Sequence, residues 1–276
     1  MSKQPIIGVI GAGLAGSMVA LLLAKLDFTV YIFEKRPKQS NDDNNNQHNS
    51  SAFGTSTSAI KRSINLALSG RGIAALKELN LVDIALKNAV PMTGRVIHNN
   101  TGTKEVRQMY GTKNQALQSV SRQDLNELLL SQMLLYTDKI QTFFGYTLLD
   151  ATKDGHCIFS NNEGIRESFS FDLVIGADGA YSALRDNLLK QGRVDFQREY
   201  IGHGYKELTI PAAVDPATGA ATYALPDYQG LHIWPRKEFM LIALPNADKS
   251  FTATLFAPYK SASGGFDRYV YIYTYI

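Results

Sequence analysis

The 276-residue sequence has little cysteine, little net charge and no long apolar run. Its single cysteine, Cys157, excludes an intrachain disulfide, a CxxC motif and a thiolate metal cage, which fits a reducing compartment. The longest aliphatic stretch, residues 18–24, is far shorter than the roughly 18 to 20 residues that a membrane span needs. The 28 Lys and Arg against 25 Asp and Glu are scattered. We therefore expect no membrane span and no nucleic-acid partner.

The sequence contains enough hydrophobic residues to form a globular core. Hydrophobic residues make up 45% of the chain, which is typical of a globular core, and the length allows two domains. Strand-like and helix-like segments alternate at first, and extended segments dominate after residue 141. This order predicts an open α/β domain interleaved with an antiparallel sheet domain.

The first 34 residues predict a strand–helix–strand unit. Residues 6–10 are aliphatic, residues 14–26 are apolar enough for a buried helix, and residues 28–34 (FTVYIFE) are β-branched and aromatic. The segment GAGLAG joins the first strand to the helix and has the glycine spacing of a dinucleotide-binding turn. The alternative is a glycine-rich turn that serves packing only.

Each glycine of this segment has a distinct expected role. Gly11 permits a tight turn, Gly13 lets the backbone approach a pyrophosphate, and Gly16 lets the helix pack closely on the strand. The phosphate then lies at a helix N-terminus. Glu34 ends the next strand, where it can accept a hydrogen bond from an adenosine ribose hydroxyl.

The rest of the chain carries further local signals. Ser121 is a candidate N-cap, and the Asn-Asn-Glu-Gly sequence at residues 161–164 predicts a hairpin turn. His232 and Trp234 alternate along one strand, so they share a face, and this pattern favours sheet packing over acid–base chemistry. Helices are expected at residues 73–79, 125–136 and 182–190, and strands at 95–110, 171–177, 231–235 and 239–244.

The strand at residues 171–177 leads into Asp178-Gly179, at the end of a strand where ligands bind in open sheets. Together, GAGLAG, a terminal Glu and the later GADGAYSALR resemble the single-component FAD-dependent monooxygenases of the aromatic hydroxylase type. Five blocks resemble, more specifically, the kynurenine 3-monooxygenases. These blocks are SINLALSGRG, VPMTGRVIH, SVSRQDLN, IGADGAYSALR and LHIWPRKEFMLIALPNADKSFTATLF.

The resemblance implies a Rossmann-like FAD-binding fold, with FAD, NADPH and O2, and hydroxylation of L-kynurenine to 3-hydroxykynurenine in tryptophan degradation and NAD biosynthesis. It also implies roles for individual residues and names no catalytic acid or base and no metal ligand. The implied cofactor contacts are Gly11, Gly13, Ala15 and Gly16 at the pyrophosphate, Glu34 at the ribose, Arg36 at the adenosine, Ala67 and Arg122 at the flavin, and Asp178 at the contact made by the Asp-Gly motif.

The resemblance further implies that Arg95 and Tyr110 bind the carboxylate of the substrate. A guanidinium can hold a carboxylate through two parallel charge-assisted hydrogen bonds, and a phenol can supply a third. The alternatives are that Arg95 is a surface cation and that Tyr110 is a half-buried strand residue.

The resemblance also implies a domain plan and a location. We expect an FAD-binding domain over residues 1–190, with an Asn-rich flexible insertion at 39–58 and substrate strands near 90–112. An incomplete β-sheet substrate domain over 191–260 and an atypical tail at 261–276 follow. The family resemblance implies the cytosolic face of the mitochondrial outer membrane, whereas the lack of an anchoring segment in this sequence favours the cytoplasm.

One family motif is missing. Related enzymes have a later GDAAHA-type motif and a P-x-x-G-Q-G segment at the flavin, and neither is present in this sequence. Three interpretations stay open: an incomplete monooxygenase, a non-catalytic FAD-binding remnant, and a truncated gene product. We expect little or no hydroxylation by the chain alone, because half of the cavity around the flavin would be absent.

Overall fold

The computed structural model describes residues 4–37, 65–101, 105–111, 115–260 and 265–266. Two compact units result: unit 1 comprises Met1–Arg62 and Leu125–Asp195, and unit 2 comprises Ser63–Asp124 and Phe196–Ile276. The predicted insertion at residues 39–58 and nearly all of the tail at 261–276 lie outside the described residues. The segment near residues 90–112 belongs to unit 2, together with the later strands.

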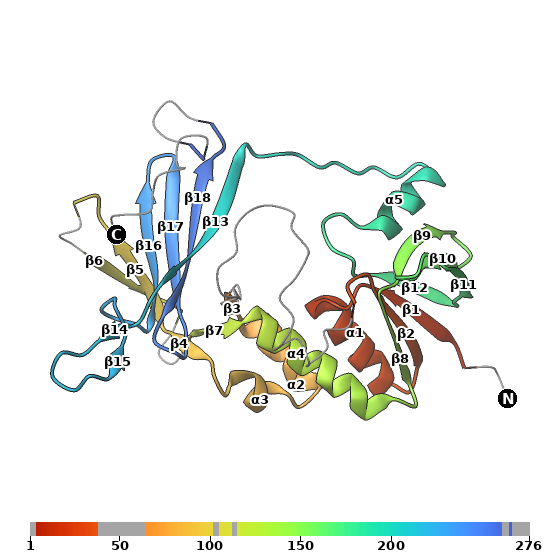
Figure 1. The fold of residues 1–276 in the computed structure, drawn as a ribbon, viewed down its shortest axis with the longest axis horizontal. Helices are drawn as coiled ribbons and strands as arrows, with labels where there is room; N and C mark the ends of the chain where they lie inside the picture. The colour runs from red at the N-terminus through yellow and green to blue at the C-terminus, as the bar shows by residue number, and fades with distance from the viewer. Residues whose placement is uncertain (1–3, 38–64, 102–104, 112–114, 261–264, 267–276) are drawn as a thin grey trace. The chain divides into compact units, whose positions relative to one another are not determined.

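Unit 1 is built on a four-stranded parallel sheet with the order β12-β1-β2-β8 (Figure 1). Its strands are β1 (Ile6–Ile10), β2 (Thr29–Glu34), β8 (Ile140–Phe144) and β12 (Leu173–Gly176). The helix α1 (Leu14–Lys25) joins β1 to β2. The predicted strand–helix–strand unit is thereby confirmed.

Both faces of this sheet are covered, which explains why β1 and β2 are apolar on both sides. Val9, Val30 and Ile32 are buried on the α1 face. The other face packs against an antiparallel sheet of β9 (Thr147–Ala151), β10 (His156–Ser160) and β11 (Arg166–Ser170). Between these layers Phe33 stacks on Phe159, with ring centroids 4.0 Å apart. Burying each such ring stabilises the unit by roughly 1.5–3 kcal/mol.

The hairpin between β10 and β11 forms at the predicted turn. The Asn161 side-chain oxygen accepts hydrogen bonds from the backbone N–H groups of Glu163 and Ile165, both at 3.0 Å. Gly164 has a φ of 79°, which glycine adopts without strain. Cys157 on β10 is a fully buried core residue, as predicted, and burial raises its pKa to about 11.

The predicted strand at residues 171–177 is shorter than expected, because only β12 (Leu173–Gly176) pairs in the parallel sheet. Phe171 is drawn instead into the core, where its backbone N–H donates to the Gly155 oxygen at 3.0 Å. Beyond β12, the Ser182 hydroxyl accepts from the Arg185 N–H and caps α5 (Ala183–Lys190). This helix matches the prediction for residues 182–190.

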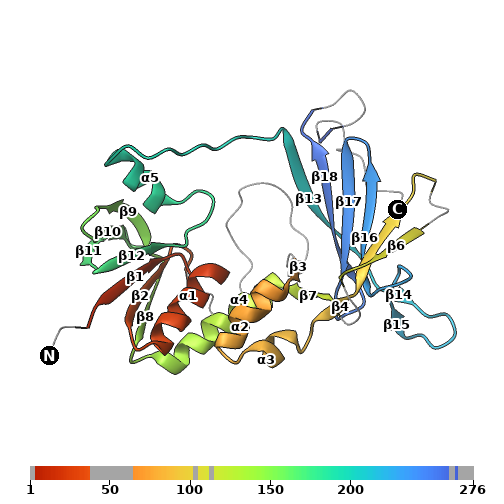
Figure 2. The same cartoon turned by 180° about the vertical axis from the view of Figure 1, so that it is seen from behind.

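Unit 2 is built on a six-stranded sheet with the order β13-β18-β17-β16-β5-β6 (Figure 2). Its neighbouring strands are antiparallel except for β5 and β16, which are parallel. The predicted strands at residues 231–235 and 239–244 are confirmed as an antiparallel pair. The six strands are β5 (Gly94–His98), β6 (Glu105–Met109), β13 (His203–Ile210), β16 (Gly230–Arg236), β17 (Phe239–Pro245) and β18 (Phe251–Pro258).

Two smaller sheets and the remaining helices complete the described elements. One sheet has the order β3-β7-β4 and the other pairs β14 with β15. These elements are β3 (Asn65–Leu68), β4 (Val90–Met92), β7 (Leu117–Ser121), β14 (Ala213–Val214), β15 (Ala221–Thr222), α2 (Gly70–Glu78), α3 (Val82–Leu86), α4 (Arg122–Met133) and the 3-10 turn η1 (Leu134–Tyr136).

The helix starts show where propensity misleads. α2 begins at Gly70, three residues before the predicted start at Ile73, and the Ile73 N–H already donates to the Ser69 oxygen at 3.0 Å. The first turn of α2 is Gly-Arg-Gly, and glycine has a low helix propensity, so the sequence does not indicate a helix there. The N–H groups of a first turn have no intrahelical partners in any helix. α4 begins directly after Ser121, whose hydroxyl accepts from the Asp124 N–H at 3.1 Å, as the N-cap prediction requires.

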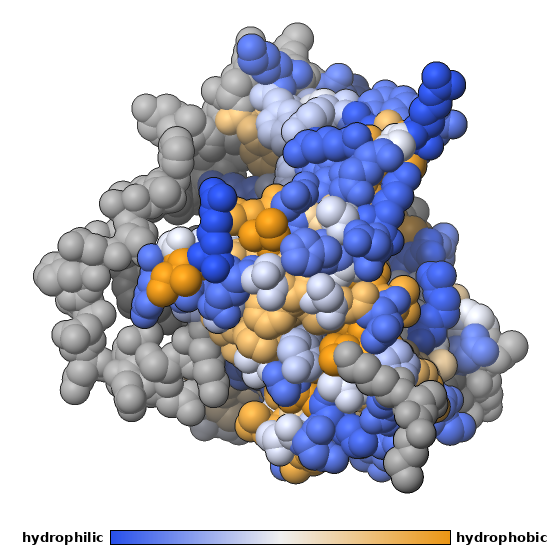
Figure 3. Space-filling view, turned by 90° about the vertical axis from the view of Figure 1, so that its right-hand side faces the viewer, coloured by the Kyte–Doolittle hydropathy of each residue, from blue (hydrophilic) through white to orange (hydrophobic). Residues whose placement is uncertain are grey.

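On the face seen in Figure 3, polar side chains surround apolar patches that gather towards the centre. Large exposed apolar residues include Leu135 and Leu173, at 72% and 51% exposure. Among the described helices, none combines the length and the hydropathy needed to traverse a lipid bilayer.

Candidate functional site

The glycine turn of unit 1 places its backbone tightly between two strands. Gly11 has a φ of 100°, and its N–H donates to the Phe33 oxygen at 2.7 Å. A Cβ added at Gly11 would lie 2.5 Å from the Ala177 oxygen. Both the positive φ and the close contact therefore require glycine at this position.

Gly13 and Gly16 differ sharply in their surroundings. A Cβ at Gly16 would lie 1.8 Å from the Gly11 oxygen, so this glycine lets α1 pack on the turn. A Cβ at Gly13 would meet nothing within 4 Å. Gly13 is also the N-cap of α1, which has no side-chain cap and no acidic residue in its first turn. The N-terminus of α1 thus faces open space with its N–H groups available to an anion.

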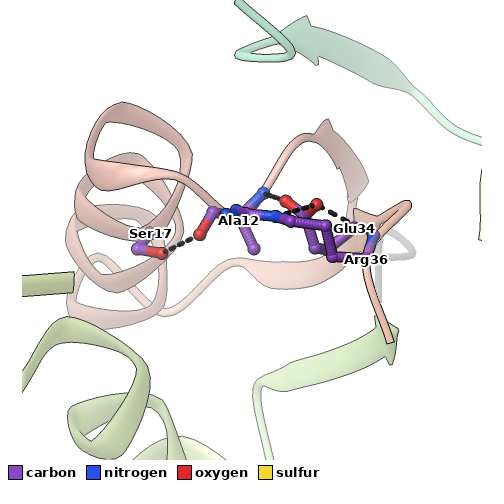
Figure 4. A network of polar contacts seen from close by, with 4 residues as sticks. All are labelled: Ala12, Ser17, Glu34 and Arg36. Atoms are coloured by element: carbon purple, nitrogen blue, oxygen red, sulfur yellow. Dashed lines mark hydrogen bonds and ion pairs between the residues drawn. The ribbon is translucent and has the colours of Figure 1, made fainter. Parts of the chain in front are cut away.

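Glu34 connects this turn to the end of β2 (Figure 4). One carboxylate oxygen accepts from the Ala12 N–H at 3.0 Å, and the other accepts from the Arg36 N–H at 3.0 Å and from Arg36 Nε at 2.8 Å. The Ser17 hydroxyl donates to the Ala12 oxygen at 3.2 Å. Because a carboxylate has about four acceptor positions, three contacts leave room for one more donor, such as a ribose hydroxyl.

These contacts set the charge state of Glu34. Burial raises the pKa of its carboxyl, but the hydrogen bonds from Arg36 and Ala12 outweigh burial, so the pKa lies below its ordinary value. The ionised carboxylate therefore stabilises the fold above the unfolded-state pKa, and this contribution is lost as the pH falls through the folded-state pKa.

We expect Glu34→Gln to lower the free energy of unfolding by roughly 1–2 kcal/mol at pH 7, because the charge-assisted bonds to Arg36 become neutral ones. The difference between the two proteins should shrink at acidic pH, as the pH falls below the ordinary glutamate pKa and towards the lowered pKa of the folded wild-type carboxyl. Urea denaturation at pH 7 and at acidic pH measures this, with the exposed Glu163→Gln as a matched control. Equal stabilities of wild type and Glu34→Gln at pH 7 would contradict the network.

Asp178 lies beside the same turn. A Cβ at Gly11 would lie 2.9 Å from the Asp178 Cα, so the two loops are in contact. Asp178 Oδ2 accepts from the Leu184 N–H at 3.2 Å. Its Oδ1 is buried and has no hydrogen-bond partner among the described residues. A buried carboxylate oxygen without a donor is costly, which fits a site whose donor belongs to a ligand.

The residues of unit 1 thus fit the ADP portion of a dinucleotide. The structure brings together Gly11, Gly13, Gly16, Glu34 and Asp178, with Ala15 in the first turn of α1. Arg36 is also present and is ion-paired to Glu34. A pyrophosphate requires the open helix N-terminus, and a ribose requires the carboxylate.

Unit 2 brings Arg95 and Tyr110 together. The Arg95 guanidinium carbon lies 5.5 Å from the centroid of the Tyr110 ring, which is cation–π range. Arg95 is exposed on β5, and the Tyr110 N–H donates to the Thr93 oxygen at 2.9 Å. The pair can present a guanidinium and a phenol to the same carboxylate.

Two other predicted residues lie elsewhere in unit 2. Ala67 is exposed on β3 opposite Ser119 of β7, and Arg122 is the exposed first residue of α4. The Asn65 side-chain amide donates to the Ser119 hydroxyl at 2.9 Å and fixes β3 on β7.

The sequence did not indicate the role of Arg107. Its guanidinium forms an ion pair with Asp227 and donates to the Thr93 hydroxyl at 2.5 Å, so it braces the strand end that carries Tyr110. No local pattern links residues so far apart in the chain, and only the sheet register could have revealed the contact. Within the described ranges, no cluster of three or more His, Cys, Asp or Glu could hold a metal ion.

Comparison with known proteins agrees with this geometry. Residues 9–61 match the NAD(P)-binding Rossmann-like domain family. The chain is 41% identical over 256 residues to a kynurenine 3-monooxygenase of Sus scrofa, and 38% identical over 262 residues to one of Anopheles gambiae. These matches cover 92% and 94% of this chain. The chain spans about half the length of these relatives, 49% and 50%.

Solved structures share the fold. A tetrameric 2-methyl-3-hydroxypyridine-5-carboxylic acid oxygenase superimposes with a TM-score of 0.69 at 18% identity, covering 98% of this chain and 64% of the oxygenase chain. A p-nitrophenol 4-monooxygenase from Pseudomonas putida gives a TM-score of 0.68 at 13% identity, covering 94% of this chain and 59% of that chain. At such identities these likenesses show the fold alone.

Proposed function

We propose that this chain, a relative of the kynurenine 3-monooxygenases, takes part in an FAD-dependent hydroxylation of L-kynurenine to 3-hydroxykynurenine with NADPH and O2. The observation that carries the proposal is the open space beside Gly13 at the N-terminus of α1, next to the Glu34 carboxylate. This arrangement suits the pyrophosphate and ribose of FAD. The choice of L-kynurenine as the substrate rests on the sequence relatives, which are kynurenine 3-monooxygenases.

When bound, FAD supplies the redox chemistry that activates oxygen for insertion into an aromatic ring. The chain's own residues bind and orient. The backbone of Gly11 to Gly16, including Ala15, holds the pyrophosphate, and Glu34 accepts from the ribose while Arg36 flanks the adenosine. The free Asp178 Oδ1 accepts from a hydroxyl of the cofactor. Ala67 and Arg122 stay predicted contacts of the flavin portion.

Arg95 and Tyr110 orient the substrate. The guanidinium binds the carboxylate of kynurenine through two parallel hydrogen bonds, and the Tyr110 hydroxyl donates a third. No acid or base of the chain is required to act on the ring, because the aniline nitrogen of kynurenine activates its own ortho position. Fixing a reactant in place in this way can lower a barrier by several kcal/mol.

The proposal includes a location. By its family the protein acts at the cytosolic face of the mitochondrial outer membrane. Fractionation of cells that express the tagged chain tests this location separately from activity.

The activity is tested by joining this chain to the remaining sequence of the Sus scrofa relative and assaying the chimera with FAD, NADPH and L-kynurenine. We expect 3-hydroxykynurenine, detected by mass spectrometry, and none from the matched chimera that carries Gly13→Val. NADPH oxidation without any hydroxylated product in a folded, FAD-loaded chimera would contradict the substrate assignment.

A further inference from the structure

Two buried histidines of unit 2 bond to each other directly. His98 on β5 and His232 on β16 are 7% and 0% exposed, and His98 Nε2 lies 2.9 Å from His232 Nδ1. The His98 ring also stacks on Trp234, with centroids 4.1 Å apart and an interplanar angle of 6°. His232 and Trp234 are therefore sheet-packing residues, as their alternation predicted, but the bond between the histidines adds a polar element to the core.

The hydrogen-bond partners fix the tautomers. Glu105 Oε1 lies 3.2 Å from His98 Nδ1, and a carboxylate can only accept, so Nδ1 carries the proton. In neutral His98 the other nitrogen, Nε2, then accepts, and His232 Nδ1 donates to it. This leaves His232 Nε2 as a bare acceptor, which is buried and without a partner among the described residues.

His98 lies on the same strand as Arg95, three residues further along. Successive side chains of a strand point to opposite faces, so His98 lies on the face opposite Arg95. Leu231 pairs with Arg95 in the parallel register of β16 and β5, and His232 pairs with Val96. The pair therefore bridges the two strands within three residues of the guanidinium.

A second contact secures the same end of β5. The Arg236 guanidinium donates to the backbone oxygens of His98 at 3.2 Å and Asn99 at 2.9 Å. Side chains of β16 therefore bind β5 in two ways, in addition to the backbone pairing of the two strands. His232 bonds to the His98 side chain, and Arg236 bonds to backbone oxygens at the end of β5. On its other edge β5 pairs with β6, where His98 lies opposite Glu105.

We propose that His98 and His232 are positioning residues: as a neutral pair they clamp β5 onto β16 and so set the position of Arg95 for binding a ligand carboxylate, and acid releases the clamp. The identity of that ligand, L-kynurenine, rests on the proposed function. The clamp itself does not.

The charges around the pair favour its neutral form. Burial, with smaller contributions from the nearby His98 and Arg107, lowers the pKa of His232 to about 4. Burial and then Arg236 lower the pKa of His98, and Glu105 only partly opposes them. Arg107 is itself ion-paired with Asp227. The unfolded histidines bind protons first, so the clamp's stabilisation is full at neutral pH and is lost as the pH falls below the ordinary histidine range.

Trp234 offers a direct test, because it is the only tryptophan of the chain and touches His98. A histidine that becomes an imidazolium quenches the fluorescence of an indole in contact with it. We expect the emission to stay constant from about pH 8 to 6 and to be quenched only near or below pH 5, well under the ordinary histidine pKa of about 6.5. Quenching with a midpoint at the ordinary histidine pKa of about 6.5 would overturn the neutral pair.

The positioning role is tested through Arg95 itself. The Arg95 guanidinium carbon lies 5.5 Å from the Tyr110 ring centroid, and we expect the adjoining δ-methylene protons to show an upfield ring-current shift in NMR spectra. This shift should be lost in His98→Gln and His232→Gln and kept in the matched control His203→Gln. In wild type it should be lost with the same pH midpoint as the Trp234 emission, a measurement that needs no variant to fold.

The affinity for L-kynurenine is the second test of the positioning role. The dissociation constant for L-kynurenine should rise about 3- to 10-fold in His98→Gln at pH 7.5 and stay unchanged in His203→Gln. If wild type fails to bind L-kynurenine, the proposed function fails, and the Arg95 shift still decides the clamp. Folded glutamine variants that keep both the Arg95 shift and the wild-type affinity would overturn the positioning role.

Discussion

Replacing Gly13 with valine should abolish FAD binding and spare the fold, whereas replacing Gly16 with alanine should damage the fold. A side chain at Gly13 enters open space in the structure, where the pyrophosphate is expected. We expect FAD affinity to fall at least about 100-fold, because several hydrogen bonds to a charged group are lost. The fold loses about 1 kcal/mol or less, the usual cost of a poorer N-cap.

The alanine at position 16 has the opposite effect. Its Cβ would lie 1.8 Å from the Gly11 oxygen, so the backbone of the turn or of α1 must move. We expect a loss of roughly 2–3 kcal/mol in the free energy of unfolding, as for other overpacked sites. Urea denaturation and FAD titration of both variants measure the contrast. A Gly13→Val protein that binds FAD as tightly as wild type would refute the assignment of the turn.

Arg95→Ala should weaken L-kynurenine binding by about 1.5–3 kcal/mol, or roughly 10- to 150-fold, the range for hydrogen bonds to a charged group. Arg95→Lys should recover only part of this loss, because an ammonium cannot form the two parallel bonds of a guanidinium. Arg166→Ala, an exposed arginine on β11 in unit 1, is the matched control and should bind as wild type does.

The ligand offers a second control in this experiment. The decarboxylated analogue of L-kynurenine lacks the group that Arg95 is expected to bind, so wild type and Arg95→Ala should bind it equally. Isothermal titration of FAD-loaded protein with both ligands measures the four affinities. A wild-type affinity for L-kynurenine in Arg95→Ala would remove Arg95 from the substrate site.

The sequence predicts the first βαβ unit well because its signals are local. The aliphatic run Ile6–Ile10, the glycine turn and the apolar helix follow one another directly, and β1 and α1 begin at the predicted residues. The turn at residues 161–164 and the caps Ser121 and Ser182 are equally local, since each acts on a neighbouring backbone group.

The contacts that the sequence could not predict join distant segments. The parallel pairing of β5 with β16 brings together residues about 135 positions apart, and nothing in either strand specifies the other. The ion pair of Arg107 with Asp227 and the bond between His98 and His232 depend on that register. Phe171 shows the same limit. Its apolar neighbours in sequence predict that it belongs to the strand, but in the structure it precedes β12 and packs in the core.

We propose that the glycine turn of unit 1, together with Glu34, holds the ADP portion of FAD. The most direct test of this proposal is to incubate the purified protein with FAD, separate free cofactor by gel filtration and record the visible spectrum of the protein peak. We expect flavin bands that elute with wild type and are missing from Gly13→Val. A wild-type protein that is folded by circular dichroism but elutes without flavin would contradict it.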